Sequence, residues 1–234
     1  IMLRNLIFNI FFFTGIILIS IIFLPSLILP KSVVITGGQL MGWWAGFCLK
    51  IIMFTKIEVI GKENIIKNEK FFIASSHQSM FETFFLQTIF NSPVFILKKE
   101  LLNIPIFGWY LNKIGSISIK RNKVTKDNLS FFYDVNKLIK NSSRPLIIFP
   151  QGTRVNPDER PLFKKGAGRI YEELKISCQP IAINSGYVWP KMGVKKPNKK
   201  ITVSILPAIN SSLDKNEFVK SLEEKIYSEL NRIN

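Results

Sequence analysis

The chain has 234 residues, 47% of them hydrophobic, and a formal net charge of +16 at pH 7. This length allows one catalytic domain plus a membrane anchor, with ample apolar residues for a core. The two cysteines, Cys48 and Cys178, are too few for a disulfide framework and have no metal-binding spacing, so a reduced, cytosolic setting is expected.

The positive charge is unevenly placed along the chain. Up to Thr55 there are three cations, Arg4, Lys31 and Lys50, and no acidic residue, which leaves +13 of the +16 for the rest. An excess on the polar part of the chain suits anionic lipid headgroups, a phosphorylated substrate or nucleic acid.

The first apolar segment covers residues 6–24, within a longer stretch without charge from Asn5 to Pro30. At about 1.5 Å per residue it is long enough to cross a bilayer core of about 30 Å. The sequence Phe23-Leu24-Pro25 offers no small-residue cleavage site. We therefore predict a retained membrane helix rather than a signal peptide.

A second, weaker apolar segment covers residues 33–55. It carries three glycines spaced by four, which predict close packing on a neighbouring helix: Gly38, Gly42 and Gly46. Residues 1–55 are thus predicted to form a two-helix membrane hairpin, the second helix inserted less deeply, with Trp43 and Trp44 at headgroup level. Arg4 before the hairpin and the basic region after it favour the cytoplasmic face for both.

From residue 56 to the end, short apolar runs alternate with helical patterns. The predicted strands are 57–60, 71–74, 94–97, 116–119, 146–149, 180–184 and 201–206, and the predicted helices are 79–90, 100–112, 125–141, 165–176 and 214–232. Such alternation predicts an α/β domain over residues 56–234, with a mainly parallel sheet flanked by helices. Functional sites in such sheets gather where strands end and helices begin.

The only histidine of the chain, His77, lies in FFIASSHQSMFETFF at 71–85, between a predicted strand and helix. If His77 precedes the helix and Glu82 lies in its first turn, the carboxylate can reach back to one ring nitrogen and leave the other free as a general base. The alternative is structural: Ser79 and Glu82 fit a capping box, in which Glu82 only bonds a backbone amide.

Two further strands end in basic residues. The strand at 146–149 runs into Gln151-Gly152-Thr153-Arg154, a turn whose amides, hydroxyl and guanidinium suit a phosphate. The other begins at Gly115 and ends in Lys120 and Arg121. Taken singly, an ordinary surface turn explains the first pattern equally well, and two cations after a strand are more often simply solvated.

Together these segments resemble the 1-acyl-sn-glycerol-3-phosphate acyltransferase (lysophosphatidate acyltransferase) family of bacterial type, over residues 56–207. Its histidine and acid separated by four residues are matched by His77 and Glu82, and its glycine-to-arginine strand by Gly115 to Arg121. Its FPEGTR block is matched by FPQGTR at 149–154, and its V-P-V/I-type strand by QPIAI at 179–183. Two positions depart from the family pattern: Glu82 replaces the usual Asp, and Gln151 replaces the usual Glu.

The resemblance implies transfer of a fatty acyl group from an acyl-CoA or acyl carrier protein thioester to the sn-2 hydroxyl of lysophosphatidate, forming phosphatidate. His77 would be the base and Glu82 would orient it. The acceptor phosphate would be bound by a basic set: Lys120, Arg121, Gly152, Thr153 and Arg154. No metal or cofactor is expected, and the resemblance implies the inner membrane of the cell, with the catalytic domain on its cytoplasmic face.

Three alternatives remain open from the sequence. The first is an acyltransferase acting on glycerol 3-phosphate or another lysolipid. The second is a thioesterase using Cys178 and His77. The third is a non-catalytic, membrane-tethered basic module that binds anionic lipid or nucleic acid. Of these two partners nucleic acid is not expected, because the chain shows no recognisable nucleic-acid module.

Overall fold

The computed structural model describes residues 1–90, 92–119 and 126–234. Within them a seven-stranded sheet has the order β1-β7-β6-β2-β5-β3-β4. The strands are β1 (Lys56–Ile60), β2 (Phe71–Ser75), β3 (Val94–Lys98), β4 (Ile117–Ile119), β5 (Leu146–Ile148), β6 (Ser177–Ile183) and β7 (Lys200–Ile205). All neighbouring pairs are parallel except β6 with β7, which confirms the predicted mainly parallel α/β fold.

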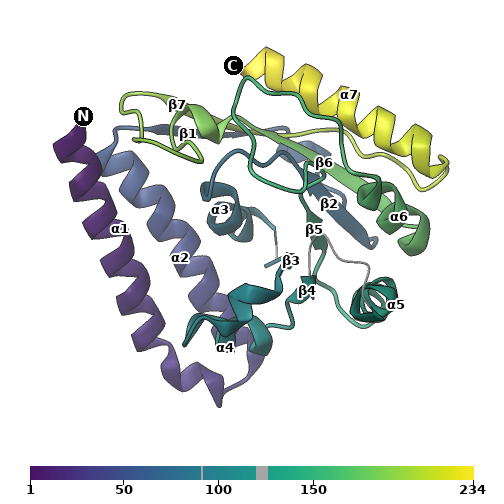
Figure 1. The fold of residues 1–234 in the computed structure, drawn as a ribbon, viewed down its shortest axis with the longest axis horizontal. Helices are drawn as coiled ribbons and strands as arrows, with labels where there is room; N and C mark the ends of the chain where they lie inside the picture. The colour runs from purple at the N-terminus through teal and green to yellow at the C-terminus, as the bar shows by residue number, and fades with distance from the viewer. Residues whose placement is uncertain (91, 120–125) are drawn as a thin grey trace.

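Helices cover both faces of this sheet (Figure 1). They are α1 (Met2–Ile22), α2 (Lys31–Ile52), α3 (Phe81–Ile89), α4 (Phe107–Lys113), α5 (Lys126–Lys140), α6 (Lys165–Leu174) and α7 (Lys215–Ile233), with short 3₁₀ helices η1 (Leu24–Leu27), η2 (Lys62–Asn64), η3 (Lys99–Asn103) and η4 (Ser185–Tyr187). Alternating residues of the central strands face opposite sides. Phe72 and Leu146 pack with α5, α6 and α7, whereas Ile73 and Ile147 pack with α2 and α3.

The single helix predicted at 100–112 is wrong. The chain instead forms η3 and then α4, and Ile106 between them has a positive φ of 63°. Pro105 explains the break, because a proline lacks the amide donor of a helix interior and disfavours helical geometry in the residue before it.

The N-terminal hairpin does not project from the rest of the chain but lies along one side of it (Figure 1). Asn5 of α1 forms two hydrogen bonds with the backbone of Lys195, of 2.7 and 2.9 Å. Near the other end of α1, the Tyr110 hydroxyl of α4 donates to the Ser20 carbonyl over 2.6 Å. Both ends of α1 are therefore tied to the domain that follows.

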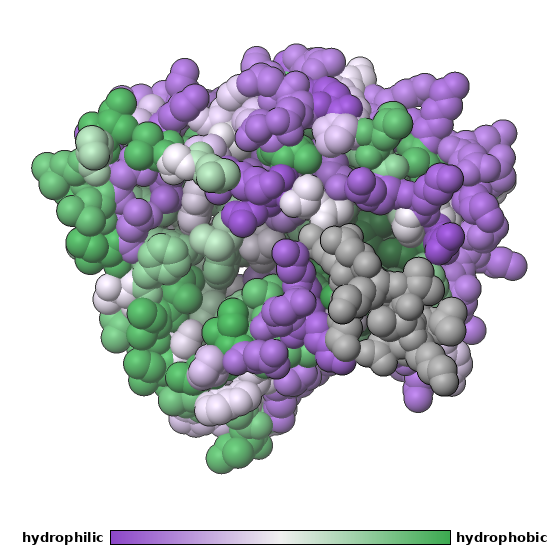
Figure 2. Space-filling model, in the orientation of Figure 1, coloured by the Kyte–Doolittle hydropathy of each residue, from purple (hydrophilic) through white to green (hydrophobic). Residues whose placement is uncertain are grey.

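The outer surface of α1 is strongly apolar. Figure 2 shows hydrophobic residues along the edge that the hairpin forms. Of the helices in the described residues, α1 alone is long and apolar enough to cross a membrane, judged by length and composition. Its exposed large side chains are Met2, Leu3, Leu6, Ile7, Ile10, Phe11, Phe13, Ile17, Leu18, Ile21 and Ile22. Such a surface is typical of a site that contacts a membrane or another protein.

The glycine repeat of α2 packs closely, as predicted, and its neighbour is α3. A Cβ on Gly42 would collide with the Phe84 carbonyl oxygen and lie 2.7 Å from the Thr88 methyl carbon, and one on Gly46 would lie 3.5 Å from the Phe85 ring. Because α3 follows directly on the His77 segment, α2 supports the element that carries Glu82.

We expect Gly42→Val to lower the free energy of unfolding by about 3 kcal/mol, because the new side chain would force α2 and α3 apart. The melting temperature in detergent should then fall by roughly 6–12 °C for a chain of this size. The control is Gly166→Ala in α6, where an added Cβ meets nothing within 4 Å. An unchanged melting temperature for Gly42→Val would contradict this helix contact.

Candidate active site

Three loops meet at one edge of the sheet because they follow adjacent parallel strands. β2 lies between β5 and β6 and is parallel to both, so the carboxyl ends of the three strands point the same way. The loops that begin there are 76–80, 149–155 and 184–188. The residues predicted from separate parts of the sequence are thereby brought together.

His77 and Glu82 are in contact. β2 ends at Ser75 and α3 begins at Phe81, so His77 lies in the connecting loop and Glu82 in the first turn of the helix. The Nδ1 atom of His77 lies 3.4 Å from Oε2 of Glu82, and the exposed fractions of the two side chains are 14% and 0%. Nδ1 is buried and forms no hydrogen bond, so Glu82 is its neighbour at ion-pair distance and the ring is accessible only at its other atoms.

The Glu82 carboxylate also caps the start of α3. It accepts hydrogen bonds from the amides of Gln78, at 3.2 Å, and of Ser79, at 3.0 Å, and a short one from the Ser185 hydroxyl. The capping role that was the alternative to catalysis is therefore present, and it coexists with the histidine contact. The backbone bonds keep the carboxylate close to His77.

The 149–155 loop wraps around His77. The Phe149 ring stacks on the imidazole, with centroids 4.0 Å apart. Gln151 accepts a hydrogen bond of 2.7 Å from the His77 amide, and the Val155 amide donates over 2.9 Å to the His77 carbonyl. The 149–155 loop thus holds the histidine by its ring and by both its backbone groups. The amide oxygen of Gln151 accepts its hydrogen bond without carrying a charge.

The predicted phosphate-binding residues of this loop differ in whether they are free to contact an anion. The Gly152 amide closes the turn onto the Phe149 carbonyl, at 2.9 Å, so it does not face an anion in this conformation. Thr153 is exposed and Arg154 is partly exposed, and no hydrogen bond or ion pair to the Arg154 guanidinium is seen among the described residues. Lys120 and Arg121 lie outside those residues.

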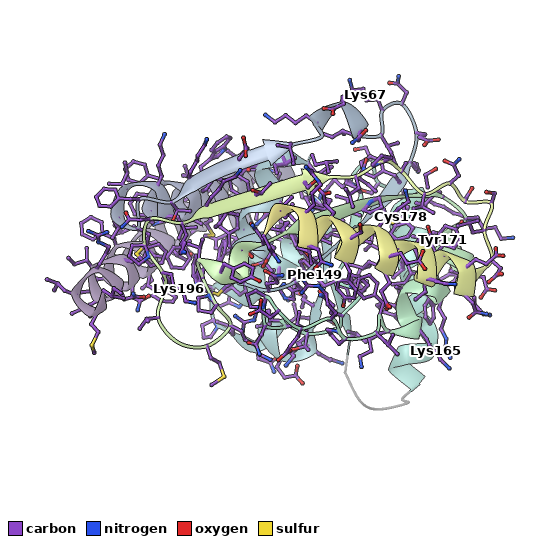
Figure 3. The ribbon with its side chains drawn as sticks, turned by 90° about the horizontal axis from the view of Figure 1, so that it is seen from above. Lys67, Phe149, Lys165, Tyr171, Cys178 and Lys196 are labelled. Atoms are coloured by element: carbon purple, nitrogen blue, oxygen red, sulfur yellow. The ribbon has the colours of Figure 1, made fainter. Side chains whose placement is uncertain are left out.

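Cys178 does not suit the thioesterase alternative. It is fully buried in β6, and burial raises the pKa of its thiol well above the usual value. A nucleophilic cysteine needs a thiolate at an accessible position. Figure 3 shows Cys178 beside Tyr171 near α7, whereas Phe149, which stacks on His77, lies nearer the centre of the molecule.

Sequence reasoning missed Ser185 and Gln78 as members of this site. Ser185 donates to Glu82, and the Gly186 amide donates over 3.1 Å to the Gln78 side chain. The polar triplet Asn184-Ser185-Gly186 directly after a strand was the available signal. It could not be used without knowing that β6 lies beside β2.

Three comparisons place the chain among known proteins. A family model described as Acyltransferase matches residues 56–184. The 1-acyl-sn-glycerol-3-phosphate acyltransferase of Pseudomonas aeruginosa is 33% identical over 171 residues, 72% of this chain and 66% of the relative. The enzyme of the same name from Saccharomyces cerevisiae is 28% identical over 193 residues, 79% of this chain and 63% of the relative.

The crystal structure of a 1-acyl-sn-glycerophosphate (LPA) acyltransferase from Thermotoga maritima superposes with a TM-score of 0.81, at 23% identity, over 99% of this chain and 96% of that one. This likeness extends the shared fold to the N-terminal hairpin. The chain spans about two thirds of the length of the first curated relatives, 66% and 63%. The family model nevertheless matches more than half of the chain, and the chain belongs to the acyltransferase family.

Proposed function

We propose that the protein transfers a fatty acyl group from an acyl-CoA or acyl carrier protein thioester to the sn-2 hydroxyl of 1-acyl-glycerol-3-phosphate, forming phosphatidate. The observation that carries the proposal is the contact of His77 with Glu82 at the sheet edge where the FPQGTR loop begins. The names of the related proteins support the choice of acceptor.

The proposed reaction begins with a proton transfer. With Glu82 facing Nδ1, that nitrogen carries the ring proton and Nε2 can accept the proton of the acceptor hydroxyl. The hydroxyl oxygen attacks the thioester carbonyl, the carbon–sulfur bond breaks, and the proton on Nε2 passes to the leaving thiolate. Glu82 stabilises the imidazolium formed between the two steps. The mechanism uses only side chains of this protein, and the expectation that no metal or cofactor takes part stays a prediction.

We assign the acceptor phosphate to Arg154, aided by Thr153, Lys120 and Arg121. Arg154→Ala should raise the KM for lysophosphatidate about 10-fold or more while leaving the thioester KM unchanged, because a hydrogen bond to a charged group contributes about 1.5–3 kcal/mol. Steady-state kinetics with each substrate varied in turn will measure this. If only the thioester KM rises, the phosphate is bound elsewhere.

Membrane contact through the apolar surface of α1 fits this reaction, since acceptor and product both carry acyl chains that prefer the bilayer. Lysophosphatidate could then reach the site by lateral diffusion. We propose the inner membrane as the location, with the sheet on its cytoplasmic side, as the cations flanking the hairpin favour.

The nearest rival is an acyltransferase that acts on glycerol 3-phosphate or on another lysolipid. Purified protein in detergent should be offered one labelled thioester with a panel of acceptors, and then acyl-CoA and acyl carrier protein thioesters in turn. The proposal expects lysophosphatidate to be the preferred acceptor. Preferred acylation of glycerol 3-phosphate or of a lysolipid without a phosphomonoester would overturn it.

A further inference from the structure

We propose that Ser185 is a positioning residue, which holds the Glu82 carboxylate in the orientation that presents one oxygen to His77. The role in turnover rests on the acyl transfer proposed above. The role of Ser185 in orienting Glu82 does not depend on that reaction, because it concerns only contacts among the described residues.

Ser185 is placed by the sheet. It is the first residue of η4, two residues after Ile183, the last residue of β6. β6 pairs with β2, the strand that leads to His77. Its side chain is fully buried, and its hydroxyl donates to Oε1 of Glu82. A buried hydroxyl that had no partner would cost free energy, so this contact is strongly favoured over alternatives.

The two oxygens of the Glu82 carboxylate have different partners. Oε1 accepts from Ser185 and from the amides of Gln78 and Ser79, whereas Oε2 accepts from Ser79 and faces Nδ1 of His77 at 3.4 Å. Among the described residues Ser185 is the only side chain that donates a hydrogen bond to this carboxylate. It occupies Oε1 and leaves Oε2 for the imidazole.

Ser185 is itself held firmly. Its carbonyl accepts from the amides of Val188, at 3.0 Å, and Trp189, at 2.8 Å, and the next amide, that of Gly186, donates to Gln78. A Cβ on Gly186 would lie 2.9 Å from Cβ of Gln78, so the two loops approach more closely than a side chain at 186 would allow. The hydroxyl is therefore fixed before any substrate binds.

The kinetic test is Ser185→Ala. We expect kcat to fall about 10-fold, with the KM values for lysophosphatidate and thioester unchanged within about 2-fold, because the ring that accepts the proton is less well oriented while the binding groups are untouched. The matched control is Ser204→Ala. Ser204 is also a buried serine that donates a short hydrogen bond to a carboxylate, that of Glu229, but it lies on β7 outside the three loops.

A second measurement is independent of turnover. Because His77 is the only histidine of the chain, ¹⁵N-histidine labelling gives one imidazole signal, whose two nitrogen shifts report which nitrogen carries the proton. In the unmodified protein without substrate we expect the proton on Nδ1. Ser185→Ala should shift the signal towards a mixture of tautomers, whereas Ser204→Ala should not move it.

Ser185→Thr keeps the hydroxyl and should restore both the single tautomer and most of kcat. If the added methyl group prevents Ser185→Thr from folding, the nitrogen shifts of Ser185→Ala alone test the positioning role. Unchanged nitrogen shifts in Ser185→Ala would overturn the proposal. A changed tautomer in a protein that never acylates lysophosphatidate would support the positioning role and refute the proposed reaction instead.

Discussion

Replacing His77 with alanine is expected to lower kcat for acyl transfer by about 10²–10⁴-fold, the range usual for loss of a general base. No other histidine in the chain could take over the proton. The FPQGTR loop would lose its ring contact with Phe149, whose centroid lies 4.0 Å from that of the imidazole. Such a stack contributes about 0.5–1.5 kcal/mol, so the melting temperature should fall by only a few degrees.

The measurement for His77→Ala pairs initial rates with circular dichroism and thermal unfolding of the same sample. The bonds from the His77 backbone to Gln151 and Val155 do not involve the side chain, so the loop should keep its position. A folded variant that turns over at the normal rate would refute the role of His77 as base.

Glu82 is expected to affect both turnover and stability, and two substitutions separate the effects. Glu82→Ala would leave the amides of Gln78 and Ser79 and the Ser185 hydroxyl without an acceptor in a fully buried place. Leaving such donors unpaired should cost about 3–5 kcal/mol of folding free energy. This variant should therefore be poorly folded as well as inactive.

Glu82→Gln keeps the size of the side chain and one acceptor oxygen but removes the charge. If the new NH₂ group takes the place of Oε2, it faces the Ser79 amide and His77. If it takes the place of Oε1, it faces the donors that Oε1 now accepts from. In both cases one hydrogen-bond donor faces another. We expect kcat to fall about 10²–10⁴-fold, as for the loss of the charge beside a catalytic histidine, with a smaller loss of stability than for Glu82→Ala. Normal turnover by Glu82→Gln would show that Glu82 serves only as a helix cap.

Much of the fold follows from local patterns in the sequence. Short apolar runs such as 71–74 and 146–149 predict buried parallel strands, which read as continuous hydrophobic stretches, and each of the seven predicted strands is present. The continuous helix predicted at 100–112 is absent because Pro105 interrupts it. The antiparallel pairing of β6 with β7 could not be predicted, because strand direction depends on contacts between distant segments.

The site was predictable to the extent that its residues lie within single motifs. His77 and Glu82 are five positions apart, so a strand followed by a helix was enough to bring them together. Ser185 lies 103 positions from Glu82, and only the placement of β6 beside β2 reveals the contact. Likewise, the sequence indicated that Gly152 was free to bind an anion, but its amide closes the turn on Phe149.

The packing of α2 on α3 has a practical consequence for protein engineering. A boundary at residues 55 and 56 suggests a soluble fragment that begins at Lys56, but such a fragment would uncover Phe84, Phe85 and Thr88, which the glycines of α2 now cover. It would also remove Phe8 and Phe12 from the Trp189 ring. The hairpin is thus packed against the rest of the chain as part of one folded unit, and an expressed fragment should include it.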